Sequence, residues 1–302
     1  MSKHAKFAIA ASHSLIIVLW ASAFVGIRVG LTAYTPGQLS LLRFLTGSAL
    51  LLILAAVFRI RLPERKDVPM ILLLGFLGFF VYHAALNYGE QTVSAGAASL
   101  FVSTTPIFAS LFALVFFRER FGIRGWIGAV VGFGGVAISA WGTGEPIVAN
   151  GGVMLILIAS LAESVYFTFQ KPFIEKYGFL AFTAYTIWAG TLFMLFFLPG
   201  LGQAVESASF EVTASVLYLG IFPTVLPYLA LAFITARVGT SEATSSLYLT
   251  PAFAYVIGWV WLGEVPSFLS LIGGAIALGG VLLATVHSDA RPDTANRMDT
   301  AT

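Results

Sequence analysis

The 302-residue sequence contains no cysteine, and charged residues make up only 10% of it. Without cysteine, the chain can form neither a disulfide framework nor a thiolate metal site. Hydrophobic residues account for 58% of the sequence and its mean hydropathy is +0.92, which lies far above the range of soluble domains. These values predict an integral membrane protein.

Motifs of enzymes and nucleotide-binding proteins are also missing. The sequence has no G-x-S-x-G, no H-E-x-x-H and no Walker A pattern, and no aspartate lies in an apolar segment. The chain therefore lacks the residues expected of a polytopic membrane enzyme or of an ATP-driven pump, and we predict no cofactor or metal site. The net charge of +2 does not indicate nucleic-acid binding, because the basic residues follow the membrane topology.

Ten segments have the composition of membrane-spanning helices, each of which needs about 20 mostly apolar residues. Turn or charge signals separate them. The predicted fold class is an all-α integral membrane protein with ten transmembrane helices, followed by a disordered cytoplasmic tail at 288–302. The helices are predicted at residues 12–31, 38–58, 69–88, 96–117, 123–141, 151–170, 179–198, 213–235, 241–262 and 267–287.

The positions of lysine and arginine predict the orientation of the chain. All of the 16 basic residues except Arg28 and Arg43 lie in alternate loops or at the termini, and basic loops stay in the cytoplasm. Both termini are therefore predicted to be cytoplasmic, in a bacterial-type inner membrane. An alternative treats residues 1–23 as a signal peptide, but the apolar sequence continues to Leu31.

The sequence contains an internal repeat. A shift of 251 − 106 = 145 residues places STTPIFAS (103–110) on YLTPAFAY (248–255). Each copy holds five predicted helices, an odd number, so the second copy (151–287) must be inverted in the membrane relative to the first (12–141). Inverted repeats are the architecture of secondary transporters, in which two halves enclose a site near the middle of the bilayer.

Several motifs also carry a resemblance to a known family. They are WASAFVGIR (20–28), LLRF (41–44), and the prolines Pro106 and Pro251 in helices that end at Glu119 and Glu264. With these features the chain resembles an EamA-type member of the drug/metabolite transporter superfamily, in its ten-helix exporter group. The resemblance implies that spans 1, 3, 4, 6, 8 and 9 line a central cavity and that substrates are amino acids, other small metabolites or amphipathic drugs.

We therefore expect a secondary active exporter that works by alternating access. Its expected partners are a small-molecule substrate, the lipid bilayer and a coupling proton or another ion. The alternatives are a polytopic membrane enzyme, or a channel or membrane scaffold without carrier activity.

Polar and aromatic side chains within the spans are the candidate site residues. His83, Asn87 and Glu90 lie at i, i+4 and i+7 on one face of the third span, which either lines the cavity or forms a polar seam between helices. Aromatic residues with a polar group are further candidates, because that group needs a partner when buried. They are Trp20, Tyr82, Tyr88, Tyr166, Tyr228 and Tyr248.

Pro106 and Pro251 occupy corresponding places in the two repeats. Each removes a helical hydrogen bond, and we expect exposed carbonyl groups at or near Ser103 and Tyr248. Such paired breaks indicate a binding site, although a kink for packing alone is the alternative.

Glu163 and Arg43 are the charged residues that lie deepest in the predicted spans. Glu163 follows Gly151 by about 18 Å of helix, which is near the middle of the bilayer core. It is either an ion-pair partner of Arg43, a ligand for a cationic substrate or a carrier of a coupling proton. Arg43 is expected to form a structural ion pair rather than to contact the substrate. Arg28 and Lys171 are interpreted as interfacial anchors.

Small residues recur in the fifth and tenth spans. Gly128, Gly132 and Gly135 are matched in the second copy by Gly273, Ala277 and Gly280. We interpret them as surfaces for close helix packing.

Overall fold

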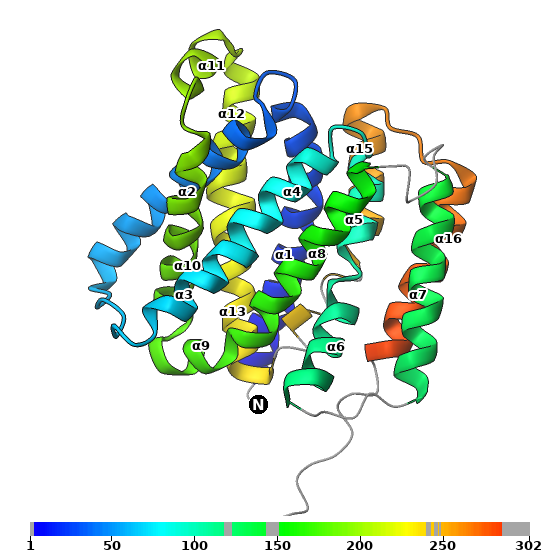
Figure 1. Ribbon diagram of the computed structural model, residues 1–302, viewed down its shortest axis with the longest axis horizontal. Helices are drawn as coiled ribbons and strands as arrows, with labels where there is room; N and C mark the ends of the chain where they lie inside the picture. The colour runs from blue at the N-terminus through cyan, green and yellow to red at the C-terminus, as the bar shows by residue number, and fades with distance from the viewer. Residues whose placement is uncertain are drawn as a thin grey trace, which may run out of the picture.

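The computed structural model describes residues 3–117, 123–142, 151–239, 243–244, 247 and 249–285, and all regular structure in this part of the chain is helical (Figure 1). The first half contains α1 (Lys3–Gly30), α2 (Pro36–Phe58), α3 (Val68–Gly75), the π-helix η1 (Phe76–Val81), α4 (Tyr82–Gly89), α5 (Ala95–Val102), α6 (Thr105–Phe117) and α7 (Ile123–Trp141). The second half contains α8 (Gly151–Phe169), α9 (Lys171–Tyr177), α10 (Phe179–Met194), the 3-10 helix η2 (Leu195–Phe197), α11 (Leu201–Ser207), α12 (Phe210–Leu219), the π-helix η3 (Gly220–Val225), α13 (Leu226–Val238), α15 (Thr250–Leu262) and α16 (Phe268–Thr285).

The described helices have the lengths and composition of a membrane protein. Six are long and apolar enough to cross a bilayer, namely His4–Gly30, Pro36–Phe58, Val68–Gly89, Gly151–Phe169, Phe179–Phe197 and Phe210–Val238. Four shorter apolar helices, Ala95–Ala109, Gly125–Ser139, Thr250–Leu262 and Phe268–Gly280, complete the ten predicted spans. The all-α membrane fold predicted from the sequence is confirmed, whereas the tail predicted at 288–302 lies outside the described residues.

Local sequence explains where several helices begin and end. Thr35 caps α2 because its hydroxyl accepts a hydrogen bond from the N–H of Gln38, whose side chain accepts one from the N–H of Thr35. Helix α15 ends at Gly263, whose φ of 69° is left-handed. Helices α9 and α11 were not predicted, because each has only seven residues and lies among turn signals.

The fourth span is broken between α5 and α6, just before Pro106. Because Pro106 has no N–H, the carbonyl that loses its helical partner is that of Val102. The hydroxyl of Thr105 donates to this carbonyl at 2.7 Å. The carbonyl of Val102, next to Ser103, is therefore not exposed, because the Thr105 hydroxyl satisfies it. The exposed carbonyl expected at Ser103 itself stays a prediction.

The arrangement of the helices follows the internal repeat. Spans three and eight each contain a π-helix, and these begin 220 − 76 = 144 residues apart, close to the shift seen in the sequence. Helix α1 packs against α13 and α15 of the second half, as α8 packs against α4, α5 and α6 of the first. The remaining symmetric contacts join α2 to α10 and α7 to α16. The first helix of each half thus packs against helices of the other half.

Helices α7 and α16 approach each other through small residues. A Cβ atom added to Gly135 would lie 2.2 Å from the backbone nitrogen of Ala277, and one added to Gly280 would lie 2.2 Å from that of Gly132. Backbone atoms cannot move away as a side chain can, so these positions accept only glycine. The predicted role of the small residues in close packing is confirmed.

The two ends of the bundle carry different loops. The N-terminus and α9 lie at one end of the molecule, and α11 lies at the other, together with the turns before α2, α5 and α16 (Figure 1). We call the first the inner end and the second the outer end, after the orientation predicted from the basic residues.

Candidate functional site

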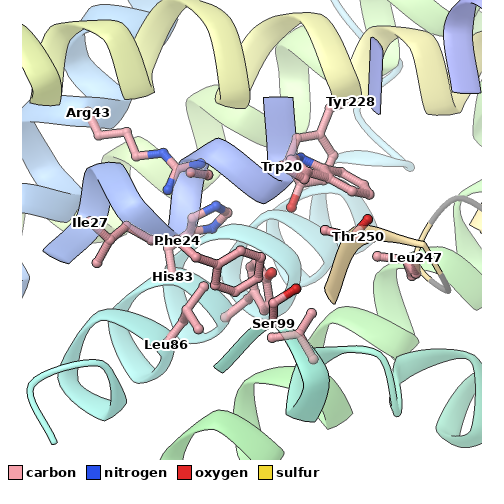
Figure 2. A pocket seen from close by; sticks show the side chains of 13 residues that line it. Trp20, Phe24, Ile27, Arg43, His83, Leu86, Ser99, Tyr228, Leu247 and Thr250 are labelled. Carbon is pink, nitrogen blue, oxygen red and sulfur yellow. The ribbon is translucent and has the colours of Figure 1, made fainter. Parts of the chain in front are cut away.

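A cavity lies between the two halves of the bundle (Figure 2). Helix α1 contributes residues at i, i+3, i+4 and i+7, which is one face of a helix: Trp20, Ala23, Phe24 and Ile27. The other lining residues come from α2, α4, α5, α13 and the segment that leads into α15: Arg43, Tyr82, His83, Leu86, Ser99, Val102, Tyr228, Leu247 and Thr250. The cavity is therefore lined by spans 1, 2, 3, 4, 8 and 9, and span 2 takes the place that the resemblance gave to span 6.

Aromatic side chains form much of the cavity wall. Trp20 and Tyr228 meet edge to face with 5.4 Å between ring centroids, and Tyr82 meets His83 in the same way at 4.6 Å. All four residues were candidates from the sequence, and all four are buried. Tyr88 is 41% exposed, so its proposed place in the cavity is wrong. Its position on α4 turns it away from the face that carries Tyr82 and His83.

Arg43 reaches the cavity from α2 and is 2% exposed. Its Nε donates to the hydroxyl of Thr224 at 2.6 Å, and that hydroxyl donates to the carbonyl of Leu219 at 2.8 Å. The guanidinium group extends toward His83 (Figure 2). The structural ion pair expected for Arg43 is not present among the described residues.

Glu163 lies on α8, directly behind the cavity wall. Its Oε1 accepts a hydrogen bond from the hydroxyl of Tyr228 at 3.0 Å, and the residue is 1% exposed. Its Oε2 has no hydrogen-bond partner in the described part of the chain. A buried carboxylate with no cation beside it is unfavourable in its ionised form. No ion pair joins Glu163 to Arg43 in the described part of the chain.

Five further sequence candidates that the structure describes are buried but do not line the cavity: Asn87, Ser103, Pro106, Tyr166 and Pro251. The amide of Asn87 donates to the hydroxyl of Ser40 at 2.8 Å, which corresponds to a polar seam between α2 and α4. The hydroxyl of Ser103 donates to the carbonyl of Leu100 at 2.6 Å. Tyr248 lies outside the described residues.

At the outer end, an ion pair joins the two halves. Arg28 Nε donates to Glu264 Oε1 at 3.1 Å, and Arg28 Nη1 donates to the backbone carbonyl of Glu90 at 2.6 Å. Glu264 Oε2 accepts from the N–H of Ala95 at 2.9 Å, at the start of α5. Arg28 is therefore more than an interfacial anchor, because it connects α1 to the ends of α4 and α15.

At the inner end, ion pairs and a hydrogen bond connect α9 to the loop before α3. Lys176 Nζ lies 2.5 Å from Asp67 Oδ2 and 2.9 Å from Glu64 Oε2, and the Tyr177 hydroxyl also donates to Asp67. The hydrogen bond from Lys176 holds the pKa of Asp67 and of Glu64 below the usual range, and the carboxylates raise the pKa of Lys176. Lys171 pairs with Glu175 at 3.9 Å, within the same helix.

The cavity between these two contacts is small. Its volume is ≈ 20 Å³, which is room for about one water molecule. Pockets for small-molecule ligands occupy about 300–1,000 Å³. In this conformation the cavity is therefore too small for a ligand of that size.

The apolar lining residues were not found by sequence reasoning. Phe24, Ile27 and Leu86 have the same composition as side chains that face lipid, so residue type alone does not distinguish them. Their spacing from Trp20 and Tyr82 was the available signal, since i+4 and i+7 positions share a face.

Comparison with known proteins agrees with this architecture. The sequence matches the EamA-like transporter family over residues 9–141 and 150–286, once in each half. A crystal structure with 19% sequence identity covers 92% of this chain, has 96% of its own chain covered and gives a TM-score of 0.65. At this identity the likeness concerns the fold alone.

Relatives with higher identity are named as transporters. An uncharacterized transporter of Bacillus subtilis, YdfC, is 53% identical over 89% of this chain and 88% of its own. A protein of Streptantibioticus cattleyicolor named a probable terminal-alkyne amino-acid exporter is 39% identical over 89% and 90% of the two chains. The Escherichia coli protein YedA, named an inner membrane transporter, is 24% identical over 90% and 88%. With the family match in both halves and these relatives, the chain belongs to the EamA-like transporter family, and it is a multi-pass membrane transporter rather than an enzyme.

Proposed function

We propose that this protein is a secondary active exporter of amphipathic amino acids that works by alternating access around the cavity. The observation that carries the proposal is Arg43, a buried guanidinium in the cavity wall with no carboxylate partner among the described residues. A buried cation without a counterion is costly, so a ligand carboxylate is its natural partner.

The apolar part of the cavity wall is suited to the side chain of an amphipathic amino acid. Trp20, Phe24 and Leu86 supply an apolar surface for a hydrocarbon side chain. The relative from Streptantibioticus is named a probable terminal-alkyne amino-acid exporter, and an amino acid with a terminal alkyne combines charged groups with an apolar hydrocarbon group.

Glu163 is the carrier of the coupling proton in this proposal. It is neutral in the closed conformation, and its hydrogen bond to Tyr228 connects it to the cavity wall. Opening to water would stabilise the ionised form, so each cycle can release and rebind one proton.

The proposal places the protein in the cytoplasmic membrane with both termini in the cytoplasm. The distribution of the basic residues supports this orientation. Labelling of a cysteine introduced at position 145 tests it, because the reagent should reach this position only from outside.

Counterflow in proteoliposomes tests the carrier function and the role of Arg43. The parental protein should show saturable exchange of amino acids, which a channel or a scaffold would not show. Arg43→Gln should weaken the apparent affinity for the substrate about 10- to 100-fold, because a hydrogen bond to a charged group contributes about 1.5–3 kcal/mol. Arg65→Gln, which changes an exposed arginine, is the control. Equal affinity in Arg43→Gln and the parent would refute the assignment.

A further inference from the structure

The outer end of the bundle contains a second buried carboxyl group. Glu90 follows α4 directly and is 0% exposed, and neither of its carboxyl oxygens has a hydrogen-bond partner in the described part of the chain. Arg28 contacts only the backbone carbonyl of Glu90, not its side chain. The sequence placed Glu90 on a polar face of the third span but gave no reason for a carboxyl there.

Glu264 is the carboxylate that neutralises Arg28. It forms the ion pair with Arg28 and also accepts from the N–H of Ala95, in the first turn of α5, where backbone N–H groups favour a negative charge. The side chains of Arg28 and Glu264 are 33% and 20% exposed. This ion pair therefore lies at the surface, and Glu90 lies behind it without contact with water.

The charged groups near Glu90 come from three elements. They are Arg28 on α1, Glu264 after α15 and Arg43 on α2. On α8, which packs against the end of α4, the residues that meet Gly89 are Gly152 and Ile156, and neither carries a charge. Arg28 is already paired with Glu264, and Arg43 forms no hydrogen bond with the Glu90 carboxyl group in the described part of the chain. An ionised Glu90 would thus be buried beside a second carboxylate without a hydrogen-bond donor, which is strongly unfavourable.

We propose that Glu90 is a proton-binding site that controls closure of the outer end, an inference that rests on the proposed alternating access. The outer end closes with Glu90 protonated. When Arg28 and Glu264 separate, water reaches Glu90, which loses its proton. The ionised Glu90 then attracts Arg28, which keeps Arg28 from returning to Glu264. The closed conformation binds the proton more tightly than the open one, so by linkage acid outside favours closure and higher pH favours opening.

This assignment gives the outer proton a role in the cycle. An exporter releases its substrate at the outer end and must then close before it can reload. If closure requires a proton on Glu90, the acid outer side of an energised bacterial membrane promotes this step.

A single cysteine in place of Ser99 reports the state of the outer end. Ser99 lines the cavity one helical turn below Ala95, and the chain has no other cysteine. A membrane-impermeant maleimide is added from outside, and the rate at which it labels this cysteine is measured. The reagent's own pH dependence is measured with a cysteine at the exposed position Ser207 and used to correct the rate. From pH about 5 to about 8 the corrected rate should rise about tenfold or more, since an exposed glutamate titrates near pH 4.3 and burial moves this by up to several units.

The Glu90→Gln variant should be labelled slowly at every pH, because glutamine mimics the protonated acid. Glu90→Asp should retain the pH dependence, and Glu211→Gln, which alters an exposed carboxyl at the same end, should behave like the parent. Infrared spectra give a readout independent of transport: the carbonyl band of a protonated carboxyl should be lost in Glu90→Gln, and a second such band should be lost in Glu163→Gln.

Two results would overturn the inference in different ways. If Glu90→Gln shows the parental pH dependence, or if no protonated-carboxyl band belongs to Glu90, Glu90 does not control closure while alternating access stands. If the cysteine at position 99 is unreachable from either side under every condition, alternating access itself fails.

Discussion

Two glutamates stand apart from the other acidic side chains in the described part of the chain, because only Glu90 and Glu163 are buried. Each has at least one oxygen without a partner. Burial of this kind destabilises the fold unless the acid is neutral. Proteins keep such residues where a change of protonation is useful, so both carboxyl groups are interpreted as functional.

The first prediction concerns Glu163. Glutamine can still accept the hydrogen bond from Tyr228, so Glu163→Gln should fold and keep the exchange of substrate for substrate, but it should lose accumulation driven by a proton gradient. Uptake into proteoliposomes with and without a pH gradient measures both activities, and Glu175→Gln, at an exposed position, is the control. If gradient-driven accumulation persists, Glu163 does not carry the proton. Weaker binding, greatest for cationic substrates, would instead make it a ligand.

At the scale of helices, the packing of α1 and α8 differs from that of α7 and α16. Helices α1 and α8 each pack against several helices of the opposite half, whereas α7 and α16 pack mainly against each other. The seam between α7 and α16 depends on glycine, because backbone meets backbone there.

A pair of adjacent glycines tests this seam. A Cβ atom at Gly134 would meet nothing within 4 Å, whereas one at Gly135 would lie 2.2 Å from a backbone nitrogen. Gly134→Ala should be neutral or stabilise by up to about 1 kcal/mol, because alanine favours a helix. Gly135→Ala should destabilise by about 1–3 kcal/mol through overpacking. Thermal unfolding of the purified protein in detergent compares them, and equal melting temperatures would contradict the close packing of α7 and α16.

At the scale of the whole molecule, polar contacts join the two halves at both ends. The outer contact uses Arg28 and Glu264, and the inner contact uses Lys176 with Asp67 and Glu64. In the proposed rocking motion, one of these contacts breaks while the other is kept. A substitution that weakens one contact should therefore increase the population of the conformation that is open at that end.

Lys176 tests the inner contact, and Lys171 on the same helix provides the matched control. Lys176→Gln should increase cytoplasmic labelling of a cysteine at position 99 several-fold, whereas Lys171→Gln should not, because Lys171 pairs only within α9. The pKa of Asp67 is lowered by Lys176, so the contact should persist at neutral pH and be lost only below about pH 4, the usual value for aspartate. If Lys176→Gln and Lys171→Gln label at the parental rate, the inner contact does not hold the closed conformation.

The sequence by itself determined the membrane class, the number of spans and the inverted repeat. Hydropathy reports the length of each span directly, and a repeat is visible as residues that recur at a fixed shift. It also singled out Trp20, Tyr82, His83 and Tyr228 as cavity candidates, because polar groups within a span need a partner.

Only the tertiary structure decided which polar side chains form ion pairs or hydrogen bonds with each other. Arg28 and Glu264 are 236 positions apart in the chain and Glu163 and Tyr228 are 65 apart, and no local pattern encodes such pairs. The sequence placed both Arg43 and Glu163 within membrane spans and so made them possible partners, but position along a helix does not fix the direction of a side chain. The packing of α1 and α8 between opposite halves sets those directions, and it separates Arg43 from Glu163 while it buries Glu90 behind Arg28.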